Sequence, residues 1–381
     1  MSLISRACRA CRASSYAIAF ATLLILPAAA GDRDRDGDRA KPIVIAKQGS
    51  FAVGGTVVKV PGTFDPTVFL PPPPGQSLHG DHAYVQYQIP QNPRKYPLVM
   101  WHGGAQFSKT WETTPDGREG FQNIFLRRGF STYILDQPRR GRAGTGTVGI
   151  TIEPAPRDQF LFNLFRIGQW PNYFPNVQFA RDAESLNQYF RQVTSDTGPN
   201  DREVQANAVS ALFDKIGDAV LLTHSDSGSR GWITAMKNRK VKAIVSYEPI
   251  TFAFPAGQLP PPRNPALPQM SVSLAEFRKL TRIPIQIVIG DNIPKGPSPN
   301  AALQFWVDTV ANTKDFVKAI NDNGGDAEIL FLPQIGVRGN THFPFSDLNN
   351  VKIADLLSQY LDRKGLNRRA SFDDFEDHAS R

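Results

Sequence analysis

The stretch from residue 219 to residue 237 constrains the fold more than any other part of the chain. Its apolar first part, residues 219–222, predicts a short buried strand, and its last part can form a helix. The junction between them, T-H-S-D-S-G at residues 223–228, is crowded with small residues. A serine on a sharp turn from a strand to a helix is a nucleophile elbow, which holds the Ser225 hydroxyl clear of the sheet. The alternative is a polar turn in which Ser225 or Ser227 caps the helix.

The usual sequence of such an elbow is G-x-S-x-G, because the backbone of the turn passes close to its neighbours. Thr223 and Ser227 stand at the two glycine positions here. Both are small, but neither is equivalent to glycine. The motif therefore leaves both interpretations open, and the rest of the chain has to decide between them.

Buried strands and helices alternate through most of the chain, which predicts an α/β fold with a mostly parallel central sheet flanked by helices. Buried strands are expected at residues 98–101, 132–135, 219–222, 243–247, 285–289 and 328–332. Helices are expected at residues 120–128, 180–193, 202–216, 229–237, 301–321 and 351–361. Extra strands are expected before them at residues 42–47, 51–60 and 83–89, the last at a sheet edge because apolar and polar residues alternate in it.

The N-terminal 30 residues have the pattern of a secretory signal peptide. Three arginines precede an apolar run at residues 16–26, and small residues precede a cleavage site after Ala30. We therefore expect a secreted or periplasmic protein without stable membrane insertion after cleavage; a retained membrane anchor is the alternative. Cleavage removes both cysteines, Cys8 and Cys11, and lowers the formal net charge from +8 to +5 because three arginines and no acids are lost. This modest charge, without a nucleic-acid motif, argues against a nucleic-acid partner.

The remaining chain divides into segments of different composition. Residues 31–41 form a mixed-charge linker that we expect to be disordered, residues 42–363 the α/β domain, and residues 364–381 a flexible tail. An insertion at about residues 150–200 is dense in large apolar side chains, which indicates either an extra helix on the core or a cap that lines an apolar acyl pocket. The proline-rich residues 251–270 are expected to be a long loop or a second lid element. The oligomeric state is not determined, and a homodimer is one option.

A nucleophilic serine needs a base, which in turn needs an orienting acid. Of the six histidines, only His342 follows both the elbow and the last strand and lies outside the tail, in a loop with a helix after it. Two acids end strands that follow the elbow strand, Glu248 and Asp291. Sequence alone does not separate them, although Glu248 is favoured because Asp291 comes earlier after its strand than the usual offset.

The oxyanion of an acyl-transfer reaction needs preorganised N–H donors. The residue after the nucleophile, Asp226, supplies one backbone N–H, and the glycine loop after residue 101 supplies the other. Gly104 is the expected second donor, with Gly103 or Ala105 as alternatives. The Asp226 carboxylate would oppose the developing oxyanion unless it turns away or pairs with Arg230. No metal-binding spacing or phosphate-binding loop occurs, so we expect no cofactor.

Several separate segments resemble a small group of bacterial α/β-hydrolase esterases. They are W-H-G-G at residues 101–104, T-W-E-T-T-P-D-G-R at 110–118, D-Q-P-R-R-G-R at 136–142, T-H-S-D-S-G at 223–228 and Y-E-P at 247–249. The similarity spans about residues 83–361, and the W-E-T-T-P-D-G block is the most specific part. The group also departs from G-x-S-x-G at its elbow.

The resemblance implies a Ser-Glu-His triad of Ser225, Glu248 and His342, with oxyanion donors at Gly104 and Asp226. It implies hydrolysis of a small-molecule carboxylic ester through an acyl-enzyme intermediate. A lactonase or amidase with the same triad is one alternative, and a catalytically silent α/β-hydrolase fold that binds a ligand is another. The substrate-binding residues do not follow from the resemblance, because the insertion and the proline-rich loop match poorly.

Overall fold

A computed structural model of the protein describes residues 41–370. The predicted signal peptide, nearly all of the predicted linker and residues 371–381 of the predicted tail lie outside the described residues. The folded unit described below begins at Ile43.

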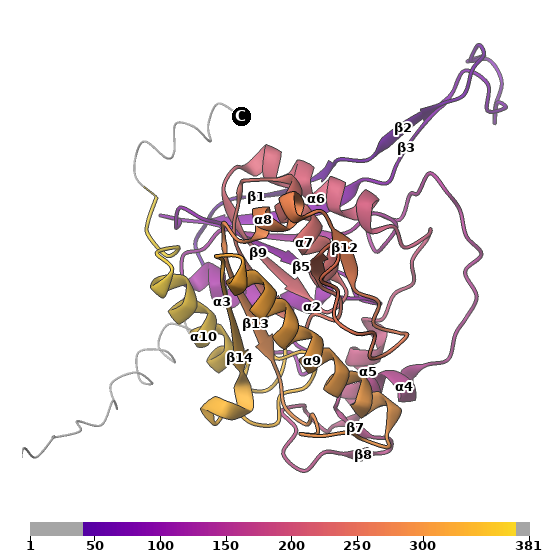
Figure 1. The fold of residues 1–381 in the computed structure, drawn as a ribbon. Helices are drawn as coiled ribbons and strands as arrows, with labels where there is room; N and C mark the ends of the chain where they lie inside the picture. The colour runs from indigo at the N-terminus through magenta and orange to yellow at the C-terminus, as the bar shows by residue number, and fades with distance from the viewer. Residues whose placement is uncertain (1–40, 371–381) are drawn as a thin grey trace, which may run out of the picture. The chain divides into compact units, whose positions relative to one another are not determined.

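The centre of this unit is an eight-stranded sheet with the order β1-β4-β6-β5-β9-β10-β13-β14 (Figure 1). β1 and β4 run antiparallel to their neighbours, and the strands from β6 to β14 are parallel. The strands of the sheet are β1 (Ile45–Val53), β4 (Ala83–Pro90), β5 (Leu98–Trp101), β6 (Thr132–Asp136), β9 (Ala219–His224), β10 (Val241–Tyr247), β13 (Pro284–Ile289) and β14 (Asp326–Phe331). The predicted mostly parallel α/β architecture is confirmed.

Helices cover both faces of the sheet (Figure 1). They are α2 (Lys109–Glu112), α3 (Phe121–Arg127), α4 (Asp158–Leu164), α5 (Ala183–Arg191), α6 (Arg202–Ile216), α7 (Ser227–Lys237), α8 (Leu274–Leu280), α9 (Ala301–Asp322) and α10 (Asn350–Arg363), with a 3-10 turn η1 at Leu332–Ile335. The central strands are buried on both faces, which explains their continuous apolar runs.

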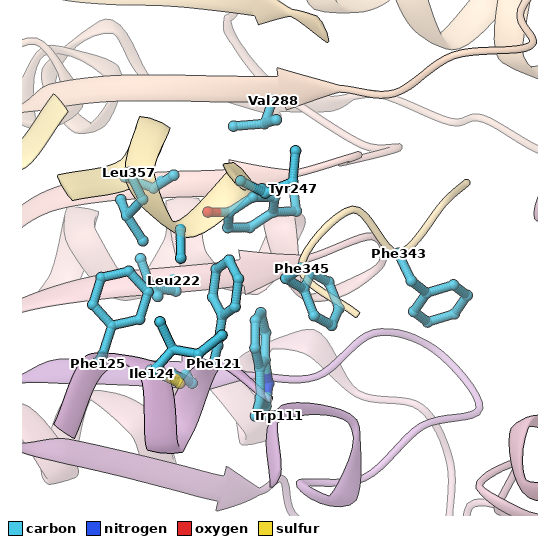
Figure 2. Close-up of a cluster of buried hydrophobic side chains, with 14 of the residues drawn as sticks. Trp111, Phe121, Ile124, Phe125, Leu222, Tyr247, Val288, Phe343, Phe345 and Leu357 are labelled. Carbon is cyan, nitrogen blue, oxygen red and sulfur yellow. The ribbon is translucent and has the colours of Figure 1, made fainter. Parts of the chain in front are cut away.

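The alternation of side chains along each strand divides the core into two layers. In β5, Leu98 and Met100 face α3, α10 and the inserted segment, whereas Val99 and Trp101 face α6 to α9. The first layer is rich in aromatic rings, several of which are drawn in Figure 2. This layer reaches the carboxyl ends of the parallel strands, where the predicted site residues lie.

Three expectations about the edges of the unit need correction. Residues 83–89 do not form an edge strand, because β4 lies between β1 and β6. The run at residues 51–60 is divided: its first part continues β1, and β2 (Thr56–Lys59) pairs instead with β3 (Ser77–Gly80) in a separate ribbon (Figure 1). Residues 364–370 hold a defined position, since the Lys95 N–H donates to the Arg368 carbonyl at 3.0 Å and Ala370 N–H to the Pro93 carbonyl at 3.2 Å. The predicted flexible tail therefore does not begin at residue 364.

The inserted segment between β6 and α6 contains α4, α5 and a small ribbon of β7 (Gly168–Gln169) and β8 (Asn172–Tyr173). Much of its apolar content packs into the core, because Leu161, Phe162, Phe165 and Ile167 all belong to the first core layer. The proline-rich loop is bounded by a parallel pair of short strands, β11 (Ala253–Pro255) and β12 (Met270–Val272).

Candidate active site

Ser225 occupies a sharp turn between β9 and α7. Its backbone is left-handed, with φ of 54°, a conformation that is unfavourable for a residue with a Cβ atom. The residue at the cap position of α7 is Asp226, and no side chain caps the helix. The turn therefore has the geometry of a nucleophile elbow rather than that of a serine cap.

Side chains at the two unusual elbow positions are held by hydrogen bonds across the sheet. The Ser227 hydroxyl accepts from the His224 N–H at 2.9 Å and lies 3.1 Å from the Trp101 carbonyl, to which it can donate. The Thr223 hydroxyl lies 2.7 Å from that of Ser246. Glycine is required at the next position, because a Cβ on Gly228 would lie 2.7 Å from Pro249 Cβ. The elbow thus accommodates Thr223 and Ser227 in place of glycine, because their hydroxyls form hydrogen bonds with neighbouring residues of the sheet.

His342 lies on the loop after η1, with its ring buried against the elbow. Its backbone carbonyl accepts a hydrogen bond from His224 Nε2 at 2.9 Å, which fixes the loop to the end of β9. Its Nδ1 lies 3.3 Å from Glu248 Oε2. Its Nε2 is buried and has no hydrogen-bond partner within residues 41–370, so it can accept a proton. Burial outweighs the effect of Glu248 and lowers the pKa of His342 to about 4, so the ring is neutral near pH 7.

Glu248 directly follows β10 and is fully buried. One carboxylate oxygen, Oε2, faces His342, and the other, Oε1, accepts from the Gly290 N–H at 2.5 Å and from Arg166 Nη2 at 2.7 Å. Burial acts to raise the pKa of Glu248, but the positive charge of Arg166 and these hydrogen bonds outweigh it and hold the pKa below its ordinary value. Glu248 is therefore a carboxylate that contacts the ring nitrogen of His342.

Asp291, the second candidate acid, has a different position. Its side chain accepts from the Gly339 N–H at 2.8 Å, and its own N–H donates to the Asn340 carbonyl at 2.9 Å. These bonds hold the start of the loop that carries His342. The structure thus places Glu248 against the histidine ring and Asp291 against the histidine loop.

Gly103 and Gly104 lie directly over the elbow. A Cβ on Gly103 would lie 3.0 Å from Ser225 Cβ, and one on Gly104 would lie 3.4 Å from Asp226 Cβ. Within residues 41–370, neither the Gly104 nor the Asp226 backbone N–H donates a hydrogen bond. Free N–H groups beside the nucleophile are what an oxyanion hole requires.

The Asp226 side chain is turned into an ion pair with Arg230, with Oδ1 2.8 Å from Nη1. Arg230 is fully buried, and its Nη1 also donates to the Asp226 carbonyl at 2.6 Å. Burial acts to raise the pKa of Asp226, but the charges of Arg230, Arg140 and Arg202 outweigh it and lower the pKa. The arginine compensates the carboxylate charge beside the expected oxyanion.

The motifs of the sequence do not indicate two of the residues at this site. One is Arg166, although an arginine between Phe165 and Ile167 in an apolar segment indicates a buried charge that needs a partner. The other is His224, whose ring supports the backbone of His342.

A cavity of about 640 Å³ adjoins the two expected oxyanion donors. Its walls come from residues 104–105, the loop at 150–158 and the segment at 193–200, together with Arg140 and Asp226. The walls mix apolar side chains with charged ones, and Arg140 pairs there with Asp196. The apolar acyl pocket, which is one of the two alternatives for the inserted segment, is therefore not found at this position.

The W-E-T-T-P-D-G block lies beneath the histidine loop. The Trp111 ring stacks on Phe345, three residues after His342, with 4.1 Å between ring centroids (Figure 2). Arg118, which directly follows the block, donates to the Asp347 carbonyl at 3.1 Å and to the Asn350 side chain at 2.7 Å. The block thus anchors the segment that follows His342.

Within residues 41–370 no group of three or more His, Cys, Asp or Glu side chains is arranged to hold a metal ion. No helix in this part of the chain has both the length and the hydropathy of a membrane span.

Comparison with known proteins gives two informative relatives. A solved structure described as a novel bacterial esterase is 31% identical, covers 85% of this chain and 98% of its own, and has a TM-score of 0.68. The probable secreted lipase phiG of a fungus (Fungal sp., strain ATCC 74256) is 28% identical over 316 residues, which are 74% of this chain and 86% of the lipase. No protein-family model matches the chain.

The fold and the relatives define the class as a hydrolase of the α/β-hydrolase fold that acts on ester bonds. The chain belongs to the family of the bacterial esterase to which it is similar. The alternative of a catalytically silent binding protein is set aside.

Proposed function

We propose that this enzyme hydrolyses carboxylic esters through an acyl-enzyme intermediate with Ser225 as nucleophile, His342 as base and Glu248 as the orienting acid. The observation that carries this proposal is the contact of the Glu248 carboxylate with His342 Nδ1, which leaves His342 Nε2 unpartnered beside the elbow. A histidine held in this way has the proton on Nδ1 and a free lone pair on Nε2.

In the first half of the reaction the Ser225 oxygen attacks the acyl carbon and His342 Nε2 takes its proton. Glu248 stabilises the imidazolium, and the Gly104 and Asp226 N–H groups hold the oxyanion. His342 then donates the proton to the leaving alcohol. Water enters, gives a proton to His342 and attacks the acyl carbon. The bond between the acyl carbon and the Ser225 oxygen then breaks, His342 returns the proton to Ser225, and the carboxylic acid is released.

The cavity beside Gly104 and Asp226 supports binding of one side of the ester at that place. Its charged walls favour a substituent with polar groups over a long alkyl chain, which would leave those groups without partners. Hydrolysis rates for esters of increasing acyl length measure how far the acyl chain uses this cavity. Lactones and amides remain alternative substrates for the same triad.

We also propose that the protein is secreted or periplasmic after cleavage near Ala30. The fungal relative is described as secreted, which supports this proposal. The segment concerned lies outside the described residues.

The triad is tested by labelling with a fluorophosphonate and by hydrolysis of an activated ester. Ser225→Ala should abolish labelling, and Glu248→Gln should lower kcat by about 10⁴-fold because the histidine loses its orienting charge. Asp291→Asn, the matched control, should retain most of the activity. Labelling of Ser225→Ala at the wild-type level would refute the mechanism, and a large loss confined to Asp291→Asn would move the acid to that residue.

A further inference from the structure

We propose that Arg166 is a positioning residue of this active site, whose buried guanidinium orients the Glu248 carboxylate toward His342 and ties the inserted segment to the catalytic loops. This inference rests on the proposed triad. Arg166 lies two residues after α4 and is fully buried. Its backbone is left-handed, with φ of 59°, which turns its side chain away from the course of α4.

Arg166 and Gly290 together occupy one oxygen of Glu248. Arg166 Nη2 lies 2.7 Å and the Gly290 nitrogen 2.5 Å from Oε1, so that Oε2 is left to face His342. A glutamate side chain has several rotatable bonds and would otherwise be free to turn. The guanidinium therefore determines which oxygen meets the histidine and from which direction.

The same guanidinium reaches the turn that holds the histidine loop. Arg166 Nε donates to the Asp291 carbonyl at 2.8 Å, and the Asp291 side chain accepts from the Gly339 N–H at 2.8 Å. This chain of bonds runs from the inserted segment to the residues just before His342. A lysine has one point of charge and cannot make both the Glu248 and the Asp291 contacts in this geometry.

Aromatic packing fixes the plane of the guanidinium. The Arg166 guanidinium carbon lies 4.2 Å from the ring centroid of Trp306, on α9, and the same ring lies 4.6 Å from that of His342. Trp306 also donates to the Leu164 carbonyl at the end of α4, which packs against α9 (Figure 1). Arg166 Nη1 is buried and has no hydrogen-bond partner in residues 41–370. The site therefore does not satisfy every N–H donor of this guanidinium.

The charge of Arg166 acts on both members of the acid–base pair. It keeps Glu248 ionised in a buried place, and it lowers the affinity of His342 for a proton. The other charged or titratable groups near the pair are His224 at the end of β9, Asp291 after β13 and Asp347 after the histidine loop. None of these three supplies a positive charge near neutral pH. Burial has the largest effect on the pKa of His342, and the charge of Arg166 lowers the proton affinity of both Glu248 and His342 further.

Arg166→Gln and Arg166→Lys test this role through the pH dependence of kcat/KM for a soluble ester. In Arg166→Gln, kcat should fall by about 100-fold or more with little change in KM, because positioning of the base is lost. The acid limb of the profile should move up by about one pH unit or more, because the Glu248–His342 pair binds its proton more tightly. Arg166→Lys keeps the charge, so its acid limb should stay near that of the wild type while kcat recovers in part.

Arg139→Lys is the matched control, because Arg139 also makes a buried ion pair but with a residue outside the triad. Its Nε lies 2.7 Å from Asp81 Oδ1. This variant should lose stability without a change in the pH profile.

The inference is overturned if the Arg166→Gln profile superimposes on that of the wild type after scaling, or if Arg139→Lys shifts the acid limb of the profile equally. If Arg166→Gln does not fold, Arg166→Lys decides: a kcat equal to the wild type overturns the inference, and a tenfold or larger loss at constant KM supports it. Retained activity of Ser225→Ala would instead refute the triad itself.

Discussion

Gly103 and Gly104 are neighbours in the sequence but approach the elbow to different extents. A Cβ on Gly103 would lie 2.6 Å from His224 Nδ1, closer than real Cβ atoms come to other heavy atoms, and 3.0 Å from Ser225 Cβ. A Cβ on Gly104 would make an ordinary contact of 3.4 Å with Asp226 Cβ. The W-H-G-G sequence therefore contains one glycine that close packing requires, Gly103, and one, Gly104, at which a Cβ would fit.

At this scale we predict that Gly103→Ala lowers kcat by about 100-fold or more, because the loop must move and displace its oxyanion donor. Gly104→Ala keeps its backbone N–H in place and should lose less than about tenfold. The measurement is kcat for an activated ester, with the thermal unfolding of both variants as a check on folding. Equal activity of the two variants would contradict the assignment of close packing to Gly103.

The loop with His342 is an element without regular structure, and its position depends on aromatic packing beneath it. Phe345 stacks on Trp111 and also contacts Tyr247, with 5.6 Å between ring centroids. Phe343 packs edge to face against Tyr189 in the inserted segment at 5.7 Å. The loop is thus held between α2, the end of β10 and α5, which are far apart in the sequence.

For this element we predict that Phe345→Leu lowers stability by about 1–3 kcal/mol and kcat by about 10- to 100-fold, because a loosened loop misplaces His342. Phe316→Leu is the matched control, since Phe316 is equally buried but lies in the opposite core layer. It should lose similar stability while kcat at 25 °C stays near the wild-type value. Chemical denaturation and initial rates measure both quantities, and an unchanged kcat in Phe345→Leu would show that the loop is held by other contacts.

Across the whole molecule, buried titratable groups make stability depend on pH. Burial lowers the pKa of His102 and of His342 to about 4 and that of His224 well below its ordinary value. Asp347 has the opposite shift, because burial raises its pKa to about 7. Below pH 6.5 the unfolded chain binds protons at the three histidines that the folded chain does not, whereas the folded chain holds one more at Asp347.

We therefore predict that the free energy of unfolding falls as the pH drops from about 6.5 toward 4, by on the order of 3 kcal/mol between pH 6.5 and pH 5 once the opposing effect of Asp347 is included. The three histidines contribute stability that is present above pH 6.5 and lost toward their folded pKa values. Asp347 opposes them, because its contribution is present below its unfolded pKa and is lost as the pH rises through about 7. Asp347→Asn removes this opposition and should make the acid loss steeper. Urea unfolding at several pH values provides the measurement, and a flat profile for the wild type would contradict the burial of these rings as neutral groups.

The sequence by itself determined the order of strands and helices, because apolar runs and helical periodicity are local properties. It also determined the candidates Ser225, Glu248, Asp291 and His342, since each ends or follows a predicted strand, and the resemblance favoured Glu248. It could not separate the roles of the two acids, because this depends on which carboxylate the loop with His342 meets.

Only the tertiary structure decided what surrounds the elbow. It brings Glu248 against His342 and Asp291 against the loop, packs the inserted segment into the core, and places Arg166 behind the acid. These contacts join residues up to 125 positions apart in the chain. Spacing and composition describe each partner alone, whereas a buried ion pair between distant segments exists only after the chain has folded.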